Sequence, residues 1–243
     1  MRILTAGLLS AALLLSTESQ AKQQHMGWGV GLAAIVQDQG YRGGDAETQI
    51  FPMVFYQGQH FYWQGPELGY RVANNFTLFA EYRFDGFELD DSDFFAGMEE
   101  RKGSLDLGAA YKFETKLVDL TLSGQADVLS EHEGYEFSAT LSKGFPALGG
   151  RLTPSLEVSY LSDSLVDYYY GVRTSEATDL RPEYIADNTV NVSLGISGMW
   201  PVTDNQNIIA AFNYSILGSE IEDSPLMEEG ESSNLFVGYV YRF

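Results

Sequence analysis

NLFVGYVYRF, residues 234–243, closes the chain and places alternate side chains on two different faces. One face is wholly apolar or aromatic and carries Leu235, Val237, Tyr239, Tyr241 and Phe243. The other face includes Asn234 and Arg242. A period of two indicates a β-strand. An apolar outside with polar groups inside suits a membrane barrel, and the last strand of a soluble β-sandwich is the alternative.

The N-terminal residues predict an exported protein. Arg2 supplies a positive charge, residues 3–15 form an apolar core, and Ser19–Ala21 fits a cleavage site. We therefore expect a signal peptide at residues 1–21, with residues 22–243 forming one barrel domain. Beyond residue 21, no apolar run reaches the roughly 18 residues that a membrane-spanning helix needs.

The composition narrows the class of protein further. The chain has no cysteine, which excludes a disulfide framework and a thiolate metal site. Its formal net charge of −20 argues against nucleic acid as a partner. Aromatic residues make up 14% of the chain, which is typical of a barrel with aromatic girdles at the two membrane interfaces.

Most of the chain repeats the alternation of its last strand. In each of the stretches 76–85, 104–113 and 118–128, all charged residues lie at alternate positions and so share one face, or parity, of the expected strand. If that parity faces a barrel lumen, the inward residues are Arg71, Glu81, Arg83, Asp106, Lys112, Asp119, Asp127, Glu136, Glu157 and Arg242. Such charges either plug a lumen or line a water path. We expect a closed or nearly closed lumen, because inward side chains can fill a barrel of this size.

The links between the expected strands alternate in length. Short links lie at 74–75, around Lys116, at 146–150 and at 201–206, whereas long ones lie at 85–102, 162–187 and 218–233. Short periplasmic turns and long outer loops are the signature of an outer-membrane barrel. With both termini on the periplasmic side, the number of strands is even. The sequence therefore predicts an all-β, antiparallel transmembrane β-barrel. We prefer twelve strands, with Gly65-Pro66 as a break between two short strands, and ten is the alternative. Pro52 lacks a backbone amide and predicts a bulge or a ladder defect.

The closing strand is similar to that of bacterial outer-membrane barrels, whose terminal aromatic residue helps to address the barrel-assembly machinery. This likeness implies that Tyr241 and Phe243 form an assembly signal. It also implies outer-membrane lipid, lipopolysaccharide and the assembly machinery as partners, and the outer membrane of a Gram-negative bacterium as the location.

Short motifs along the chain resemble the MipA/OmpV family of outer-membrane proteins. They are Leu68-Gly69-Tyr70, Tyr169–Val172 with Ser175–Ala177 behind it, and Ser224-Pro225-Leu226 leading through Glu228-Glu229 to Tyr241-Arg242-Phe243. The resemblance implies a scaffold, since the family's type member associates with a lytic murein transglycosylase and a murein synthase. We therefore expect a murein hydrolase or synthase as partner. A narrow channel for small solutes is the alternative function, and a barrel lipase is a third.

Catalytic and metal sites find little support in the sequence. His25, His60 and His132 are expected to be surface histidines, so the chain is predicted not to be an enzyme and to need no cofactor. Two acidic stretches, 85–100 and 220–231, offer hard oxygen ligands for Ca²⁺ or Mg²⁺. Without regular ligand spacing, they are interpreted as solvated loops and no metal ligand is assigned. The run Tyr168–Tyr170 is expected to join the interfacial girdle or to pack an outer loop, rather than to form a stacking platform for a ligand.

Overall fold

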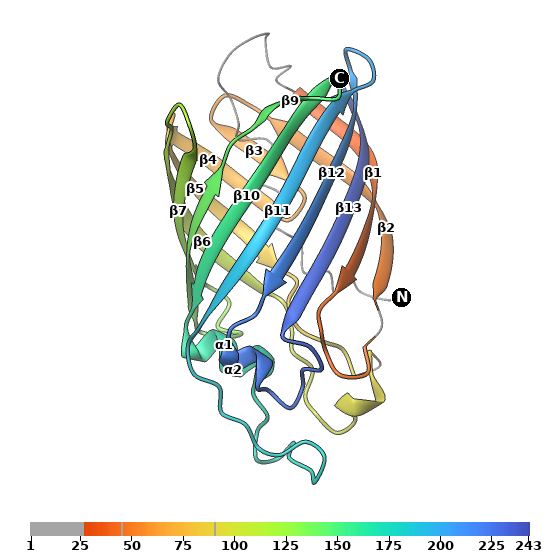
Figure 1. The fold of residues 1–243 in the computed structure, drawn as a ribbon, viewed down its shortest axis with the longest axis vertical. Helices are drawn as coiled ribbons and strands as arrows, with labels where there is room; N and C mark the ends of the chain where they lie inside the picture. Colours follow the sequence, from red (N-terminus) through yellow and green to blue (C-terminus); the bar gives the residue numbers. More distant parts are fainter. Residues whose placement is uncertain (1–26, 45, 90) are drawn as a thin grey trace.

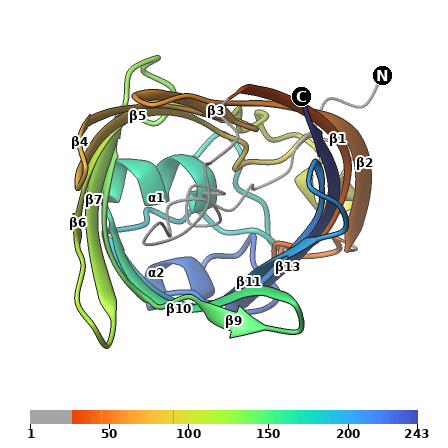
Figure 2. The same cartoon turned by 90° about the horizontal axis from the view of Figure 1, so that it is seen from above.

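The computed structural model describes residues 27–44, 46–89 and 91–243, which form a closed antiparallel β-barrel (Figures 1 and 2). The predicted signal peptide and His25 lie outside the described residues. The wall consists of β1 (Gly27–Asp38), β2 (Glu47–Gln57), β3 (Phe61–Gln64), β4 (Glu67–Ala73), β5 (Phe76–Arg83), β6 (Ser104–Phe113), β7 (Asp119–Asp127), β8 (Tyr135–Ser142), β10 (Gly150–Leu161), β11 (Thr189–Pro201), β12 (Gln206–Ile216) and β13 (Glu231–Arg242). The prediction of twelve strands is confirmed.

Four further elements complete the fold, one of which is the 3₁₀ helix η2 (Asp93–Phe95) in the loop 84–103. The short strand β9 (Phe145–Ala147) pairs with β10 as a hairpin at the rim. Helices α1 (Asp163–Tyr170) and α2 (Ser219–Glu222) lie at the opposite end of the barrel (Figure 1). Within the part of the chain that the structure describes, every helix is too short or too polar to cross a bilayer.

The barrel closes between its first and last strands. β1 pairs with β13 from Gly29 opposite Arg242 to Asp38 opposite Ser233, as the sequence predicts. The pairing of β10 with β11 completes the ring. A closed ring leaves few unpaired backbone groups, which is the condition for a β-sheet to exist in hydrocarbon.

The two ends of the barrel differ. The turn end carries the short links and the C-terminal Phe243, whereas the loop end carries residues 84–103, 162–188 and 217–230 together with both helices (Figure 1). The outward residues between the ends are apolar. On β13, Leu235, Val237, Tyr239 and Tyr241 are each 38–45% exposed. An apolar band of this kind around a whole barrel is stable only in lipid.

Glycines in the wall make room for aromatic side chains inside the lumen. A Cβ atom on Gly29 would meet the ring of Phe55, and one on Gly108 would meet the ring of Phe79. Tyr62 lies in the same way over Gly69. These rings fill part of the interior, as expected of a lumen closed by its own side chains.

Strand β2 departs from the predicted regularity. Its register with β1 runs through Pro52 without a shift, so the expectation of a bulge there is wrong. Gly58, directly after β2, donates its N–H to the carbonyl of Phe61 in β3, so the backbone N–H groups of the even-numbered residues point away from β1. Because neighbouring residues of an antiparallel strand direct their backbone groups to opposite sides, the missing N–H of Pro52 falls on the side away from β1. β3 pairs with β2 only at Phe55–Gln57, and the edge 47–54 has no partner strand among the described residues. The expected ladder defect is therefore present, on that side.

The seam between β1 and β13 generates a prediction. A Cβ atom on Gly31 would meet the backbone carbonyl of Tyr239 in β13, which cannot move aside as a flexible side chain would. We expect Gly31→Val to destabilise the folded barrel by about 1–3 kcal/mol. The measurement is the urea midpoint of the gel-mobility difference between unheated and heated protein. Ala34→Val, on the lipid-facing side of the same strand, is the matched control. An equal loss of stability in both variants would contradict the explanation.

Candidate functional site

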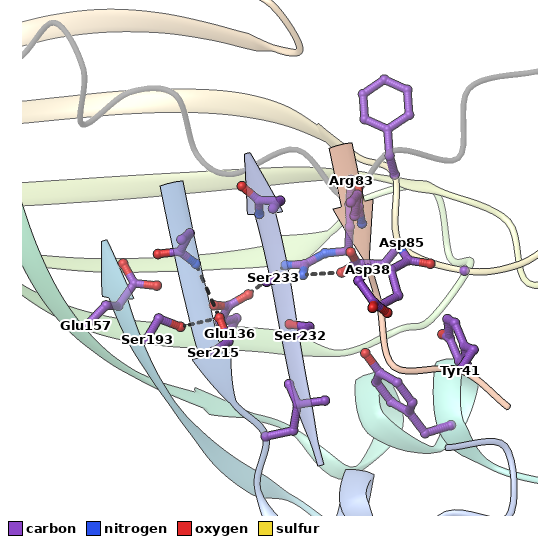
Figure 3. Close-up of a pocket in the computed structure, with 18 of the residues that line it drawn as sticks. Asp38, Tyr41, Arg83, Asp85, Glu136, Glu157, Ser193, Ser215, Ser232 and Ser233 are labelled. Carbon is purple, nitrogen blue, oxygen red and sulfur yellow. Dashed lines mark hydrogen bonds and ion pairs between the residues drawn. The ribbon is translucent and has the colours of Figure 1, made fainter. Parts of the chain in front are cut away.

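A cavity of about 230 Å³ lies inside the lumen, in the half nearest the loop end (Figure 3). One part of its lining is acidic, with Asp38, Glu81, Asp85, Glu136 and Glu157. Another part is neutral and polar, with Gln37, Gln39, Gln125, Ser155, Ser193, Asn213, Ser215, Ser232, Ser233 and Asn234. Tyr41, Tyr170 and Leu217 border it on the loop side. The cavity thus offers many oxygen acceptors and a single guanidinium, that of Arg83.

Arg83 organises the acidic side. It stands at the end of β5 on the inward parity and binds three carboxylates, at 3.0 Å to Asp85, 2.9 Å to Asp106 and 2.8 Å to Glu136. Figure 3 shows its side chain directed toward the labelled acidic residues. The guanidinium holds these carboxylates in fixed positions, since its planar fork pairs with several oxygens at once.

Two other carboxylates on this side are less engaged. Glu157 accepts one hydrogen bond, 2.8 Å from the hydroxyl of Thr140. Glu81 is 7% exposed, and its carboxyl group has no hydrogen bond or ion pair with another described residue. A buried carboxylate without a hydrogen-bond donor is costly. The cavity therefore has unused capacity to bind donors or positive charge.

The neutral side of the cavity is formed by β11, β12 and β13. Ser193 and Ser215 are hydrogen-bonded to each other at 2.8 Å (Figure 3). Asn213 donates to Ser215 at 3.2 Å. The side-chain oxygens of Gln37 and Asn234 are buried without a partner among the described residues. Gln37 and Asn234 face each other across the β1–β13 seam.

A packed cap closes the loop end above this cavity. One apolar cluster joins α1 and α2 to the strand ends and contains Leu161, Leu165, Val166, Tyr169, Ala186, Leu217, Ile221 and Met227. A second contains Phe87, Phe95, Met98, Val172 and Leu226. Tyr169 is fully buried, which fits the expectation that the tyrosine run packs an outer loop. Burial, together with the nearby carboxylate of Glu220, raises the pKa of Tyr184 in this cap to about 12.

An ion pair inside the cap joins two long loops. Arg101 and Glu176 are 2% and 3% exposed, and their side chains meet through two contacts of 2.7 and 3.0 Å. Arg101 also donates to the carbonyl of Tyr168 at 2.7 Å. Arg181, in the same loop as Glu176, donates to the carbonyl of Ala96 in the loop 84–103. Because its polar atoms are well satisfied, this network fixes the loops relative to each other.

The acidic loops keep their described carboxylates exposed or half-buried, but they also contribute to the apolar core of the cap. They supply apolar residues such as Phe87, Phe95 and Ile221 to the cap, while many of their carboxylates remain at its surface. Glu99 pairs with Arg173. The interpretation as solvated loops missed these buried apolar residues, because their spacing follows no regular period.

His132 is buried, so its interpretation as a surface histidine is wrong. Its Nδ1 accepts a hydrogen bond from the Gly134 N–H at 3.0 Å, and its Nε2 lies 3.3 Å from Asp106. Since Nδ1 is an acceptor, Nε2 carries the ring proton, and this N–H donates a hydrogen bond to Asp106. Asp127 accepts the backbone N–H groups of Leu129, His132 and Glu133. Within the described ranges, Asp106, Asp127 and His132 are the one group with metal-ligand spacing. Their atoms are already engaged, and they act as loop supports.

The other predicted lumen residues lie toward the turn end. Arg71 donates to the carbonyl of Gly58 and lies over the ring of Tyr62. Arg242 lies over the ring of Phe55. Asp119 is near Lys112 and accepts from Lys143. His60 is exposed in the β2–β3 turn and stacks on Tyr70. Of the ten predicted lumen residues, the cavity brings together Glu81, Arg83, Glu136 and Glu157.

Sequence reasoning missed the neutral side of the cavity. Ser155, Ser193 and Asn213 are small polar residues on the inward parity, so the alternation alone was a sufficient signal. It also missed Arg101 and Glu176, which lie in loops where no periodicity applies.

Comparisons with known proteins agree with the fold. Residues 30–243 match a family model described as MltA-interacting protein MipA. The putative outer membrane protein YiaT of Escherichia coli (strain K12) is 27% identical over 221 residues, covering 88% of this chain and 90% of the relative. The MltA-interacting protein of the same organism is 22% identical over 244 residues, covering 97% of this chain and 98% of the relative. Among solved structures, the translocator domain of the autotransporter NalP from Neisseria meningitidis has a TM-score of 0.50 at 11% identity and covers 90% of each chain.

The ion pair in the cap leads to a local prediction. Glu176→Gln leaves Arg101 buried without its counter-charge, which costs about 3 kcal/mol. We expect faster amide hydrogen exchange in residues 84–103 and 162–188, with the barrel strands unchanged. Glu183→Gln is the control, because Glu183 is exposed and bonds only the hydroxyl of Thr174. Equal exchange in wild type and Glu176→Gln would refute the assigned role.

The same pair sets how the cap responds to acid. Burial alone would raise the pKa of Glu176, but hydrogen bonds from Arg101 and from the N–H groups of Glu99 and Arg173 lower it to about 2. A lowered pKa means that the stabilisation is complete above the ordinary value of 4.5 and is lost as the pH falls toward 2. We expect the tyrosine near-ultraviolet circular dichroism of the cap to hold from pH 7 to 5 and to change toward pH 2. Loss of the signal between pH 7 and 5 would contradict this assignment.

Proposed function

Because the chain belongs to the MipA family of outer-membrane proteins, we propose that it is a scaffold that holds a murein-remodelling enzyme at the inner face of the outer membrane. The family description and a relative's name, MltA-interacting protein, support an enzyme of murein metabolism as the partner. The proposal assigns no catalytic step to this chain. The turn end then faces the periplasm, where murein lies.

The observation that carries the proposal is a pair of exposed leucines at the turn end. Leu117, in the β6–β7 turn, is 87% exposed, and Leu148, at the tip of the β9–β10 hairpin, is 88% exposed. Leu148 has a φ angle of 53°, in the left-handed region that leucine adopts at a cost of about 1 kcal/mol. Asparagine or glycine would suit such a turn better. An exposed leucine kept in a strained turn favours a contact role over a folding role.

Lys143 joins the two turns. Its ammonium group donates to the carbonyl of Thr115, in the β6–β7 turn, at 2.6 Å and to the carboxylate of Asp119, the first residue of β7, at 2.9 Å. Lys143 itself lies two residues before Phe145, where the β9–β10 hairpin begins. The two leucines are therefore displayed in a fixed relation, which lowers the entropy cost of binding.

The capped loop end also favours a scaffold over a channel. A channel would need an open path at both ends, whereas the cap packs two apolar clusters across one of them. The alternative function, a narrow channel for small solutes, rests on the polar cavity in the lumen.

The leucine pair can be tested in cells. We expect Leu117→Ser combined with Leu148→Ser to reduce crosslinking to a murein hydrolase or synthase, identified by mass spectrometry, about tenfold. The reason is that a bound partner would cover both apolar side chains. Leu180→Ser is the matched control, since Leu180 is 83% exposed in the loop 162–188 at the opposite end. Unchanged crosslinking in the double variant, or an equal loss with Leu180→Ser, would contradict the proposed binding surface.

Conductance separates the scaffold from the channel. In planar bilayers we expect the wild-type protein to show no steady unit conductance, because the cap closes the loop end. Glu176→Gln, which loosens the cap, serves as the comparison. A steady ohmic conductance of the wild type, with no murein enzyme recovered by crosslinking, would reverse the ranking of the two functions.

A further inference from the structure

We propose that the lumen cavity binds a linear aliphatic polyamine, such as spermidine. This site goes beyond the scaffold function, since it lies inside the barrel near the loop end and away from the turn-end leucines. The ligand class follows from three properties of the lining: its charge, its unused hydrogen-bond acceptors and the spacing of its carboxylates.

The charge of the lining selects a cation. Five carboxylates and one guanidinium line the cavity, and that guanidinium already binds Asp85 and Glu136. Glu81 is only 7% exposed and lines the cavity. Its carboxyl group has no hydrogen bond or ion pair to another described residue. Positive charge placed near Glu81 and Glu157 would satisfy both carboxylates.

The unused acceptors select a ligand rich in N–H donors. The side-chain oxygens of Gln37 and Asn234 are buried, and neither has a partner in the described part of the chain. Both residues line the cavity and stand opposite each other on β1 and β13. An ammonium group carries three N–H donors and no acceptor, so it matches carboxylate and amide oxygens together. Serine hydroxyls from β10 to β13 can receive further N–H groups.

The spacing of the carboxylates argues against a single metal ion. A bound Ca²⁺ or Mg²⁺ needs several oxygens at about 2.0–2.6 Å from one point. In residues 27–44, 46–89 and 91–243, the one group of three acidic or histidine residues with converging ligand atoms is Asp106, Asp127 and His132. Glu81, Glu136 and Glu157 do not converge in this way. Separated charges suit a chain that carries its ammonium groups several bonds apart.

Binding can be measured by isothermal titration calorimetry on folded, detergent-solubilised protein at neutral pH and low salt. We expect spermidine to bind with one-to-one stoichiometry, more tightly than the shorter diamine putrescine and more tightly than Mg²⁺. Glu81→Gln combined with Glu157→Gln should weaken spermidine binding at least about tenfold, because two ammonium–carboxylate contacts are lost. Glu133→Gln is the matched control, since Glu133 is exposed in the β7–β8 loop outside the cavity.

A second readout keeps the test independent of folding. Without ligand, Glu81→Gln should be at least as resistant to urea as wild type, because the substitution replaces a buried carboxyl group that has no hydrogen-bond donor by a neutral amide of the same size. A stable variant that has lost affinity supports the site. Unchanged affinity in the double variant, an equal loss with Glu133→Gln, or tighter binding of Mg²⁺ than of spermidine would overturn the proposal. These results leave the crosslinking test of the scaffold function unaffected.

Discussion

The structure depends on the need to pair every backbone N–H and C=O group that lies in hydrocarbon. Closing the sheet between β1 and β13 meets that need, and the small inward residues of β1, such as Gly29 and Gly31, let the two strands and the rings inside approach closely. The edge of β2 at 47–54 is the departure from this rule among the described strands, and Pro52 reduces its cost by removing one donor. Once the ring is closed, its polar residues have only the lumen in which to gather.

The lumen is divided along its length. Toward the turn end, Arg71 and Arg242 lie against aromatic rings, and Phe55 and Phe79 occupy space over glycines. Toward the loop end, carboxylates surround Arg83, and the cap covers them. The barrel therefore separates two kinds of surface. The turn end presents the exposed side chains of Leu117 and Leu148, while the polar interior is enclosed by the wall and covered by the cap.

The sequence predicts the features that depend on periodicity. Alternation along β13 predicted its pairing with β1, and the same parity led to Arg83, Glu81 and Glu157 in the cavity. The sequence did not predict the features that depend on loop packing. His132 was expected at the surface, and the pairing of Arg101 with Glu176 joins residues 75 positions apart in loops without a repeat. The strained Leu148 was also missed, because a leucine in a short link carries no sign of its backbone angle. The local alternation of residues is enough to predict the strands of the barrel wall. The cap depends on contacts between loops that are distant in the sequence.

The composition of the cap has a consequence for how the protein is made. Tyr41 comes from the first loop-end link and Met227 from the last, and the two residues form a β-bridge that also supports the buried rings between them. Such a contact forms only after β13 has joined β1. Until that moment the apolar side chains of the outer loops remain uncovered. The cap thus records the completion of assembly, because its apolar clusters are covered only in the closed ring.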